Sequence, residues 1–253
     1  MVVIMTGEGP TDYGRLDYGT KVWKEGPAAI LLRKTLAAQK INYTSLIFVG
    51  KEKVHTIKLQ RTLSGLKNRG IPCAKFLTYI ATGRIEGLSK SEDKLAVFYT
   101  DADKAQGEKN SQEAVCRQLF NELHKEINVA VKKTNASFGC VIMMPIKMIE
   151  SWLLSDENAF KAVFSTEECS FLPHKPELLW GTKTDIKSSY PKNAMNRLLD
   201  RLSGGRITDG SQEIYNEIAE KTDITVLKEK CPISFLPFYE EIAFQKMRNE
   251  KNG

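Results

Sequence analysis

The fold is decided by the stretch KLAVFYTDAD, residues 94–103. After the leading lysine, the residues up to Thr100 are apolar, aromatic or β-branched, which is typical of a strand buried on both faces. The run stops at Asp101 and Asp103, two acids that a buried strand does not carry in its interior. The stretch therefore predicts a central strand whose carboxyl end leads directly into a pair of carboxylates.

The same order of buried strand and turn is found at the start of the chain. Residues 2–5, Val-Val-Ile-Met, form an apolar run that ends in the turn Gly-Glu-Gly-Pro-Thr-Asp, residues 7–12. Helical spacing of apolar residues from Pro27 to Leu36 predicts a helix with a proline in its first turn. The apolar residues 46–49 predict the next strand.

Further helices and strands alternate up to residue 145. The sequence predicts a helix from about His55 to Asn68, ended by Gly70 as a C-cap glycine, and a long amphipathic helix over residues 111–132. An apolar strand is expected at 138–145. Strands that alternate with helices favour a largely parallel, Rossmann-like α/β sheet flanked by helices.

The composition and pattern of the sequence change near residue 161. Proline-rich stretches come first, and helical patterns follow at 194–202 and 211–220. We expect an α/β core over residues 1–160 and a mainly helical C-terminal extension, 161–253, packed on that core.

Composition limits the class of protein. No run approaches the roughly 20 apolar residues that span a bilayer, and the first residues lack the basic segment of a signal peptide, so a cytoplasmic protein without membrane contact is expected. The five cysteines are widely spaced and are expected to be reduced thiols. The formal charge of +6 is compatible with a nucleic-acid partner without demonstrating one.

The acids at the two strand ends are the strongest candidates for chemistry. In an open parallel sheet functional groups gather at the carboxyl ends of strands, where Glu8, Asp101 and Asp103 are expected. Paired carboxylates repel one another without a cation, and hard oxygen donors suit Mg²⁺ or Mn²⁺. The alternative is structural, with Glu8 in a turn and the two aspartates capping a loop.

Three stretches carry a resemblance to a known family. They are Glu-Gly-Pro-Thr-Asp at 8–12, Met-Ile-Glu-Ser-Trp-Leu-Leu-Ser-Asp at 148–156, and Cys-Pro-Ile-Ser-Phe at 231–235. With the strand ending in Asp101 and Asp103, the chain resembles the TOPRIM fold of topoisomerases, primases and OLD-type nucleases, and most closely a family of small bacterial TOPRIM-like proteins.

The resemblance implies a Mg²⁺-dependent nuclease or related phosphodiester enzyme in bacterial anti-phage defence, beside an ATPase partner. Glu8 would be an acid/base or metal ligand, and Asp101 and Asp103 metal ligands. Asp12 is either a further ligand or a carboxylate at a helix N-terminus. Glu150 follows a strand and is a candidate catalytic residue, although packing of a neighbouring tryptophan explains that stretch as well.

Between Lys51 and Lys75 the chain is rich in basic residues. Lys58 and Arg61 are spaced to lie on one face of the predicted helix and to contact phosphates of a nucleic acid. The commoner meaning of such a run is a solvated helix face.

Two other functions remain open on the sequence. A Mn²⁺-dependent glycosyltransferase also places a DxD pair after a strand, but it leaves Glu8 unexplained. A TOPRIM-like scaffold can also keep its carboxylates and serve as a non-catalytic binding or sensor subunit of an ATPase-containing complex.

Overall fold

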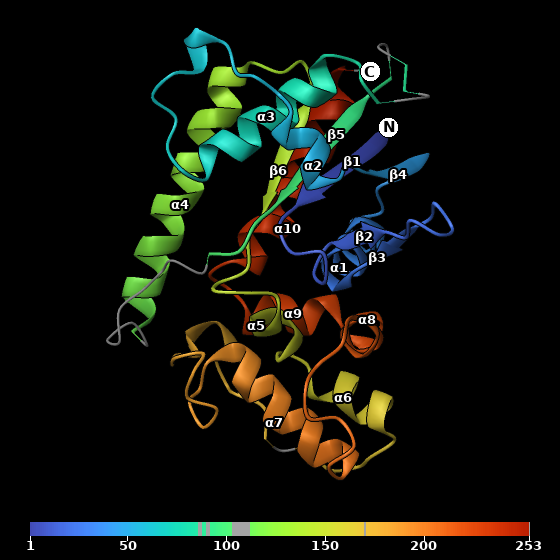
Figure 1. Cartoon of the computed structure of the whole chain (residues 1–253), viewed down its shortest axis with the longest axis vertical. Helices are drawn as coiled ribbons and strands as arrows, with labels where there is room; N and C mark the ends of the chain where they lie inside the picture. Colours follow the sequence, from blue (N-terminus) through green and yellow to red (C-terminus); the bar gives the residue numbers. More distant parts are fainter. Residues whose placement is uncertain (86–87, 90–91, 103–111, 170, 253) are drawn as a thin grey trace.

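A parallel sheet lies at the centre of the chain (Figure 1). The computed structural model describes residues 1–85, 88–89, 92–102, 112–169 and 171–252. Within these residues the sheet has the order β4-β1-β5-β6, and every neighbouring pair is parallel. Its strands are β1 (Val2–Gly7), β4 (Ser45–Phe48), β5 (Lys94–Tyr99) and β6 (Gly139–Met143). The predicted α/β class with a parallel, Rossmann-like sheet is confirmed.

Alternate side chains of the strands enter two different cores, because successive residues of a strand point to opposite faces. In β1, Val3 and Met5 join one core, and Val2 and Ile4 join the other. Residues 95, 97 and 99 of β5 lie in the first core, and residues 96 and 98 in the second. Burial on both faces explains why these strands have near-continuous apolar sequences.

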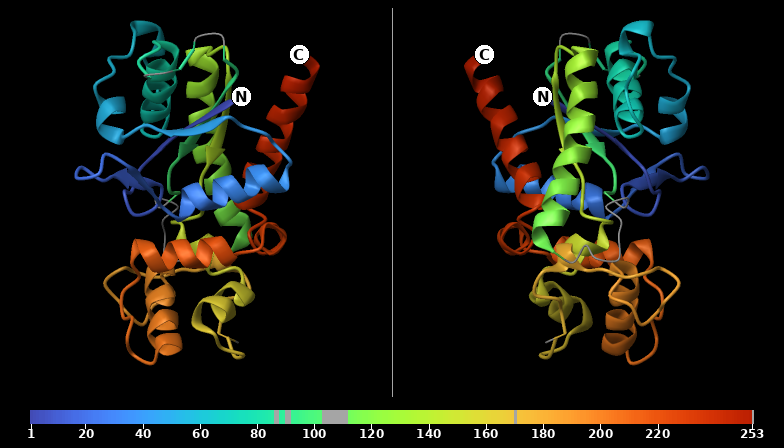
Figure 2. Two further views of the ribbon diagram at one scale, coloured as in Figure 1. Left: turned by 90° about the vertical axis from the view of Figure 1, so that its right-hand side faces the viewer. Right: turned by 90° about the vertical axis from the view of Figure 1, so that its left-hand side faces the viewer.

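Helices cover both faces of the sheet. The second core packs against α2 (Lys51–His55), α3 (Gly70–Ala81) and α4 (Glu113–Thr134), with η1 (Arg61–Leu63) at its rim. The first core packs against α1 (Pro27–Ala38) and α10 (Phe235–Asn252). Figure 2 shows α3 and α10 on opposite sides of the strands.

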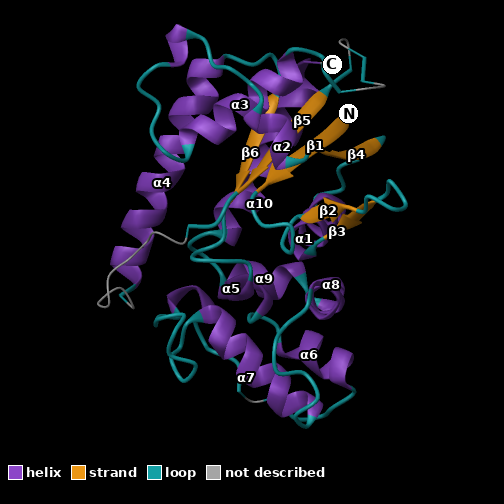
Figure 3. Cartoon of the chain, viewed as in Figure 1, coloured by secondary structure: helices purple, strands orange, loops and turns teal. Residues whose placement is uncertain are grey.

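The helical C-terminal part lies beyond the carboxyl ends of the strands (Figure 3). It comprises α5 (Glu150–Leu153), α6 (Glu157–Phe164), η2 (Pro176–Leu178), α7 (Pro191–Ser203), α8 (Gln212–Lys221) and α9 (Ile224–Lys230), followed by α10. The boundary expected after residue 160 falls inside α6. Side chains from both sides of that boundary share the first core.

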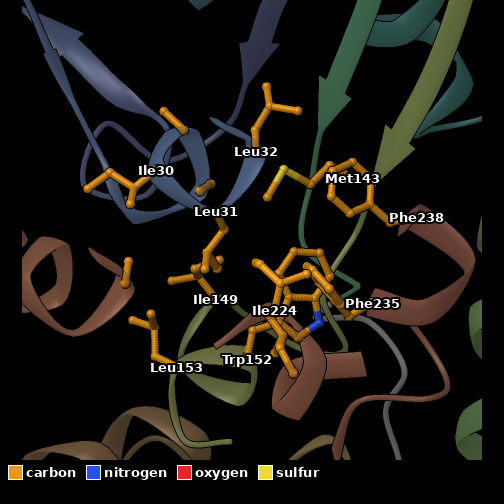
Figure 4. Close-up of a cluster of buried hydrophobic side chains, with 14 of the residues drawn as sticks. Ile30, Leu31, Leu32, Met143, Ile149, Trp152, Leu153, Ile224, Phe235 and Phe238 are labelled. Atoms are coloured by element: carbon orange, nitrogen blue, oxygen red, sulfur yellow. The ribbon is translucent and has the colours of Figure 1, made fainter. Parts of the chain in front are cut away.

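Trp152 of α5 links the helical part to the sheet (Figure 4). Its ring is fully buried and packs edge-on against Phe235 at 5.0 Å between centroids, with Phe238 beside it at 6.0 Å. The indole N–H donates to the Ser234 hydroxyl at 2.7 Å. Glu177 in turn accepts from the backbone N–H groups of Ile233 and Ser234, at 2.7 and 2.8 Å. The stretches 148–156 and 231–235, far apart in sequence, therefore pack against each other.

One predicted helix is wrong. Residues 55–68 form the end of α2, a loop and η1, and Gly70 begins α3 instead of ending a helix. A Cβ at Gly70 would lie 3.2 Å from the carbonyl oxygen of Glu126 in α4, so glycine allows the two helices to approach closely. Pro72 fits the first turn of α3, where a missing N–H costs no hydrogen bond.

A β-hairpin that the sequence did not predict lies between β1 and α1. Its strands are β2 (Gly14–Leu16) and β3 (Trp23–Glu25), which pair antiparallel. No helix among the described residues is long and apolar enough to cross a bilayer.

Candidate functional site

The candidate site lies at the carboxyl ends of β1 and β5. Gly7 and Tyr99 are register partners at the ends of these two neighbouring strands, and Glu8 and Asp101 follow them. The chain passes from β1 to β4 on one side and later to β5 on the other, so this is the point where the strand order reverses. Open α/β sheets bind ligands at such a point.

Glu8 is held in a network that reaches Asp101. Its Oε1 atom accepts from the guanidinium of Arg69, from the hydroxyl of Thr100 and, at 3.3 Å, from the backbone N–H of Asp101. Arg69 also donates to the Thr100 hydroxyl at 2.6 Å. The ion pair between Arg69 and Glu8 therefore fixes the carboxylate beside the end of β5.

Tyr99 connects the carboxylates of Asp12 and Asp101. Its hydroxyl lies 2.8 Å from Oδ1 of Asp101 and 3.2 Å from Oδ2 of Asp12. One phenolic hydrogen cannot fully satisfy two acceptors at once. Asp12 and Asp101 are thus close together with less hydrogen bonding than two charged carboxylates require.

The electrostatics of these groups show mutual repulsion. Burial, followed by repulsion from Glu150, raises the pKa of Asp12 to about 7, and the charge of Glu8 adds to this effect. Burial and then the charge of Asp12 raise the pKa of Asp101 well above its usual range. The two aspartates consequently belong to one cluster of like charge, in which neighbouring carboxylates oppose their ionisation.

Glu150 belongs to the same cluster from a different part of the chain. It begins α5, is 6% exposed, and its Oε1 accepts from the hydroxyl of Tyr215 in α8 at 3.2 Å. Burial raises its pKa. The charge of Glu150, which follows β6, therefore acts on Asp12 and Asp101, which follow β1 and β5.

Two basic residues at the site were not among the predicted site residues. Arg69 belongs to the basic run but was not distinguished within it, because only the tertiary structure shows which member turns inward. Lys192, in the first turn of α7, pairs with Asp209 at 3.7 Å. Its charge lowers the pKa values of Asp12 and Glu150. In the sequence, Lys192 is marked only by its place directly after Pro191, which begins α7.

The structure does not bring Lys58 and Arg61 into this network. Both are exposed, and they lie in the loop after α2 and in η1 instead of on one helix. The segment does contribute other residues: Lys51, His55 and Arg69 line a cavity of about 210 Å³ together with Glu8.

The oxygen atoms of Glu8, Asp12 and Asp101 are of the chemical type that a hard divalent cation prefers. They are also neighbouring carboxylates whose like charges repel, which a cation would offset. Within the residues that the structure describes, no three His, Cys, Asp or Glu side chains are already arranged to hold a metal ion. Asp103, the predicted partner of Asp101, lies outside the described residues. The cluster as described is a set of neighbouring carboxylates, with Glu8 balanced by Arg69.

Comparisons of the chain with protein-family models, with curated proteins and with solved structures gave no significant match.

Proposed function

We propose that the chain is a Mg²⁺- or Mn²⁺-dependent TOPRIM-like nuclease, or a related phosphodiester enzyme that acts on nucleic acid. One observation supports the proposal most directly. Glu8, Asp12 and Asp101 are joined by hydrogen bonds at the switch point of the sheet, and Glu150 is near enough for its charge to help to raise the pKa values of the two aspartates. Such a cluster is costly for a purely structural role, and a cation is its natural counter-charge.

Glu8, Asp12 and Asp101 would hold the metal, together with Asp103 from the same sequence motif. A divalent ion bound there would polarise a phosphate and stabilise negative charge on the attacking and leaving oxygens.

The residues around the cluster have separate tasks under this proposal. Tyr99 fixes the spacing of Asp12 and Asp101 through its two contacts. Arg69 presents a planar cation next to Glu8, suited to a phosphate oxygen. Glu150 is buried with a raised pKa, so it can carry a proton nearer to neutral pH than an ordinary glutamate.

The test is a cleavage assay of the purified protein on single- and double-stranded DNA, on RNA and on nucleotide-sugars, with Mg²⁺ or Mn²⁺. We expect phosphodiester cleavage that Asp101→Asn abolishes while the circular dichroism spectrum stays unchanged. Asp200→Asn, at an exposed acid of α7, is the matched control and should cleave like the wild type. Turnover of nucleotide-sugars alone would favour the glycosyltransferase.

A non-catalytic binding or sensor subunit is the second candidate, and the Arg69–Glu8 ion pair favours it, since that pair already neutralises one carboxylate. A metal-dependent rise in melting temperature without cleavage of any substrate would select this candidate. An ATPase partner and a role in anti-phage defence belong to either version of the proposal, and their support is the sequence resemblance. A cytoplasmic location also belongs to it, and its support is a sequence without an apolar run long enough to span a bilayer.

A further inference from the structure

The hairpin β2–β3 displays an aromatic side chain beside the candidate site. Tyr18 is 74% exposed and Val22 is 61% exposed, both in the loop that joins the two strands. The loop is ordered by Asp17, whose Oδ1 accepts from the N–H groups of Gly19 and Thr20 at 2.9 and 3.2 Å. Tyr18 belongs to neither core, and Nζ of Lys21 lies 5.8 Å from the centroid of its ring, so the loop presents an aromatic ring beside a cation on the surface.

The base of the hairpin is rigid. The Trp23 ring stacks on Phe48 of β4 with 5.1 Å between centroids and 2° between planes, and the Tyr13 ring packs against Trp23 at 5.3 Å, tilted by 46°. Gly14 has a φ of +119°, and a Cβ there would lie 2.4 Å from the carbonyl oxygen of Lys24. Asn216 of α8 donates to the Glu25 carbonyl at 2.9 Å, which ties the other strand to the helical part. The hairpin is thus a preformed platform.

Two adjoining cavities, which together we call the groove, lie between this platform and Glu8. A cavity of about 620 Å³ lies between the hairpin residues Tyr18 and Trp23 and the turn residues Gly7 and Gly9 that flank Glu8. The smaller cavity beside Glu8 and Arg69 shares two of its lining residues, Gly7 and Lys51. The volume of the larger cavity, taken by itself, falls within the range of about 300–1,000 Å³ that is usual for small-molecule sites.

The charges along the groove suit a polyanion. Arg15, Lys24 and Lys51 line the larger cavity, together with the acids Asp17 and Glu52. Asp17 is neutralised by Lys24 at 2.8 Å. Arg15 makes no ion pair with any residue of the described part of the chain, and its side chain is exposed. Cations next to an exposed aromatic ring are the combination used to bind unpaired bases and their phosphates.

We propose that this groove binds single-stranded nucleic acid and leads it to the carboxylate site, with a base stacked on Tyr18 and backbone phosphates beside Arg15 and Lys51. That the bound nucleic acid leads to the carboxylates rests on the proposed function. The binding itself requires no catalysis. A base within a duplex has no free face for a tyrosine, so single strands are the preferred ligand.

The experiment measures binding of the full chain to fluorescently labelled oligonucleotides by anisotropy, in EDTA, so that cleavage cannot interfere. The probes are a 20-nucleotide single strand of DNA, the same sequence as RNA, and the DNA duplex. We expect tighter binding of single strands than of the duplex. Tyr18→Ala should weaken single-strand binding about five- to tenfold or more, as removal of one stacked aromatic does. Tyr18→Phe should restore it, because phenylalanine keeps the ring.

The matched control is Phe244→Ala, which removes an aromatic ring that is 59% exposed on α10, a helix that does not line the groove. It should bind single strands like the wild type. Equal affinity of wild type and Tyr18→Ala, or equal weakening in Phe244→Ala, would overturn the inference. So would a preference for duplex, or an absence of nucleic-acid binding, in which case a protein partner would be the occupant of the platform.

Failure of the inference and failure of the proposed function give different results. If the wild type cleaves nucleic acid and Tyr18→Ala binds and cleaves as well as the wild type, the groove is refuted and the nuclease stands. If single strands bind through Tyr18 but are never cleaved with metal, the groove stands and the non-catalytic candidate replaces the nuclease.

Discussion

Replacing Asp12 with asparagine tests whether the folded protein raises the pKa of Asp12. The change removes one negative charge and keeps the shape of the side chain, and the asparagine carbonyl can still accept the hydrogen bond from Tyr99. In metal-free buffer above pH 7 we expect Asp12→Asn to be more stable than the wild type. Near pH 4 the two proteins should have similar stability.

The magnitude follows from the pKa of Asp12, which is raised from 3.8 to about 7 in the folded protein, chiefly by burial and then by Glu150. Because the folded state holds the proton more tightly than the unfolded chain, the contribution of Asp12 to stability falls as the pH rises from about 4 to about 7. At about 1.4 kcal/mol per pH unit, this interval corresponds to about 4 kcal/mol. Burial of the asparagine amide has its own cost, so about 4 kcal/mol is the upper limit of the gain.

The assay is urea unfolding followed by circular dichroism at several pH values between 4 and 8, with EDTA. The wild type should lose stability across this range, and Asp12→Asn should lose less of it. Asp200→Asn, the exposed control, should follow the wild type within about 0.5 kcal/mol. Parallel pH profiles for wild type and Asp12→Asn would refute the idea that burial and the neighbouring acids raise the pKa of Asp12. A changed urea slope would instead mean that the variant alters the unfolded or native ensemble.

Three more outcomes can be measured, two of them argued from the structure and one, for Lys58 and Arg61, from the sequence alone. Arg69→Ala should increase the rise in melting temperature that Mg²⁺ causes, because the Arg69 guanidinium no longer competes with the metal for Glu8. An unchanged rise would mean that Glu8 is not a metal ligand. Replacing both Lys58 and Arg61 with alanine should weaken nucleic-acid binding and reduce its salt slope by about 0.7–0.9 for each phosphate that is no longer neutralised, whereas unchanged values would make them solvated surface residues. Trp152→Ala should lower the free energy of unfolding by about 3–5 kcal/mol in urea titrations, since it empties a fully buried site between helix and sheet.

The central strands and the position of the acids could be predicted from local sequence. Strands buried on both faces have continuous apolar sequences, and β1 and β5 each end abruptly at a turn or an acid. In a parallel sheet the ends of such strands share one edge, so chain order alone predicts Glu8 and Asp101 at the same edge. The contacts of Glu8 with Thr100 and the Asp101 N–H place them there.

The structure of residues 55–81 could not be predicted because it depends on tertiary packing. Gly70 was expected to end a helix, yet here it begins α3. The reason is the close approach of α3 to α4, which local sequence does not encode. The same limit applies to Arg69. Six other lysines and arginines lie between residues 51 and 75, and only the tertiary structure shows that Arg69 is the partner of Glu8.

The arrangement of connections explains why chemistry and substrate binding would share one edge of the sheet. The connection from Gly7 to Pro27 is much longer than a tight βα turn, and it contains both the Glu8–Asp12 turn and the hairpin. Its insertion leaves β1 and α1 packed as in any parallel unit, since Ala28 still donates to the carbonyl of Asp12 at 2.9 Å beyond the hairpin. The hairpin is thereby anchored at its base next to a carboxylate of the cluster. A strand held on Tyr18 would need to cross only this one connection to reach Glu8, so under both proposals one insertion at the switch point would supply the platform and the metal ligands Glu8 and Asp12.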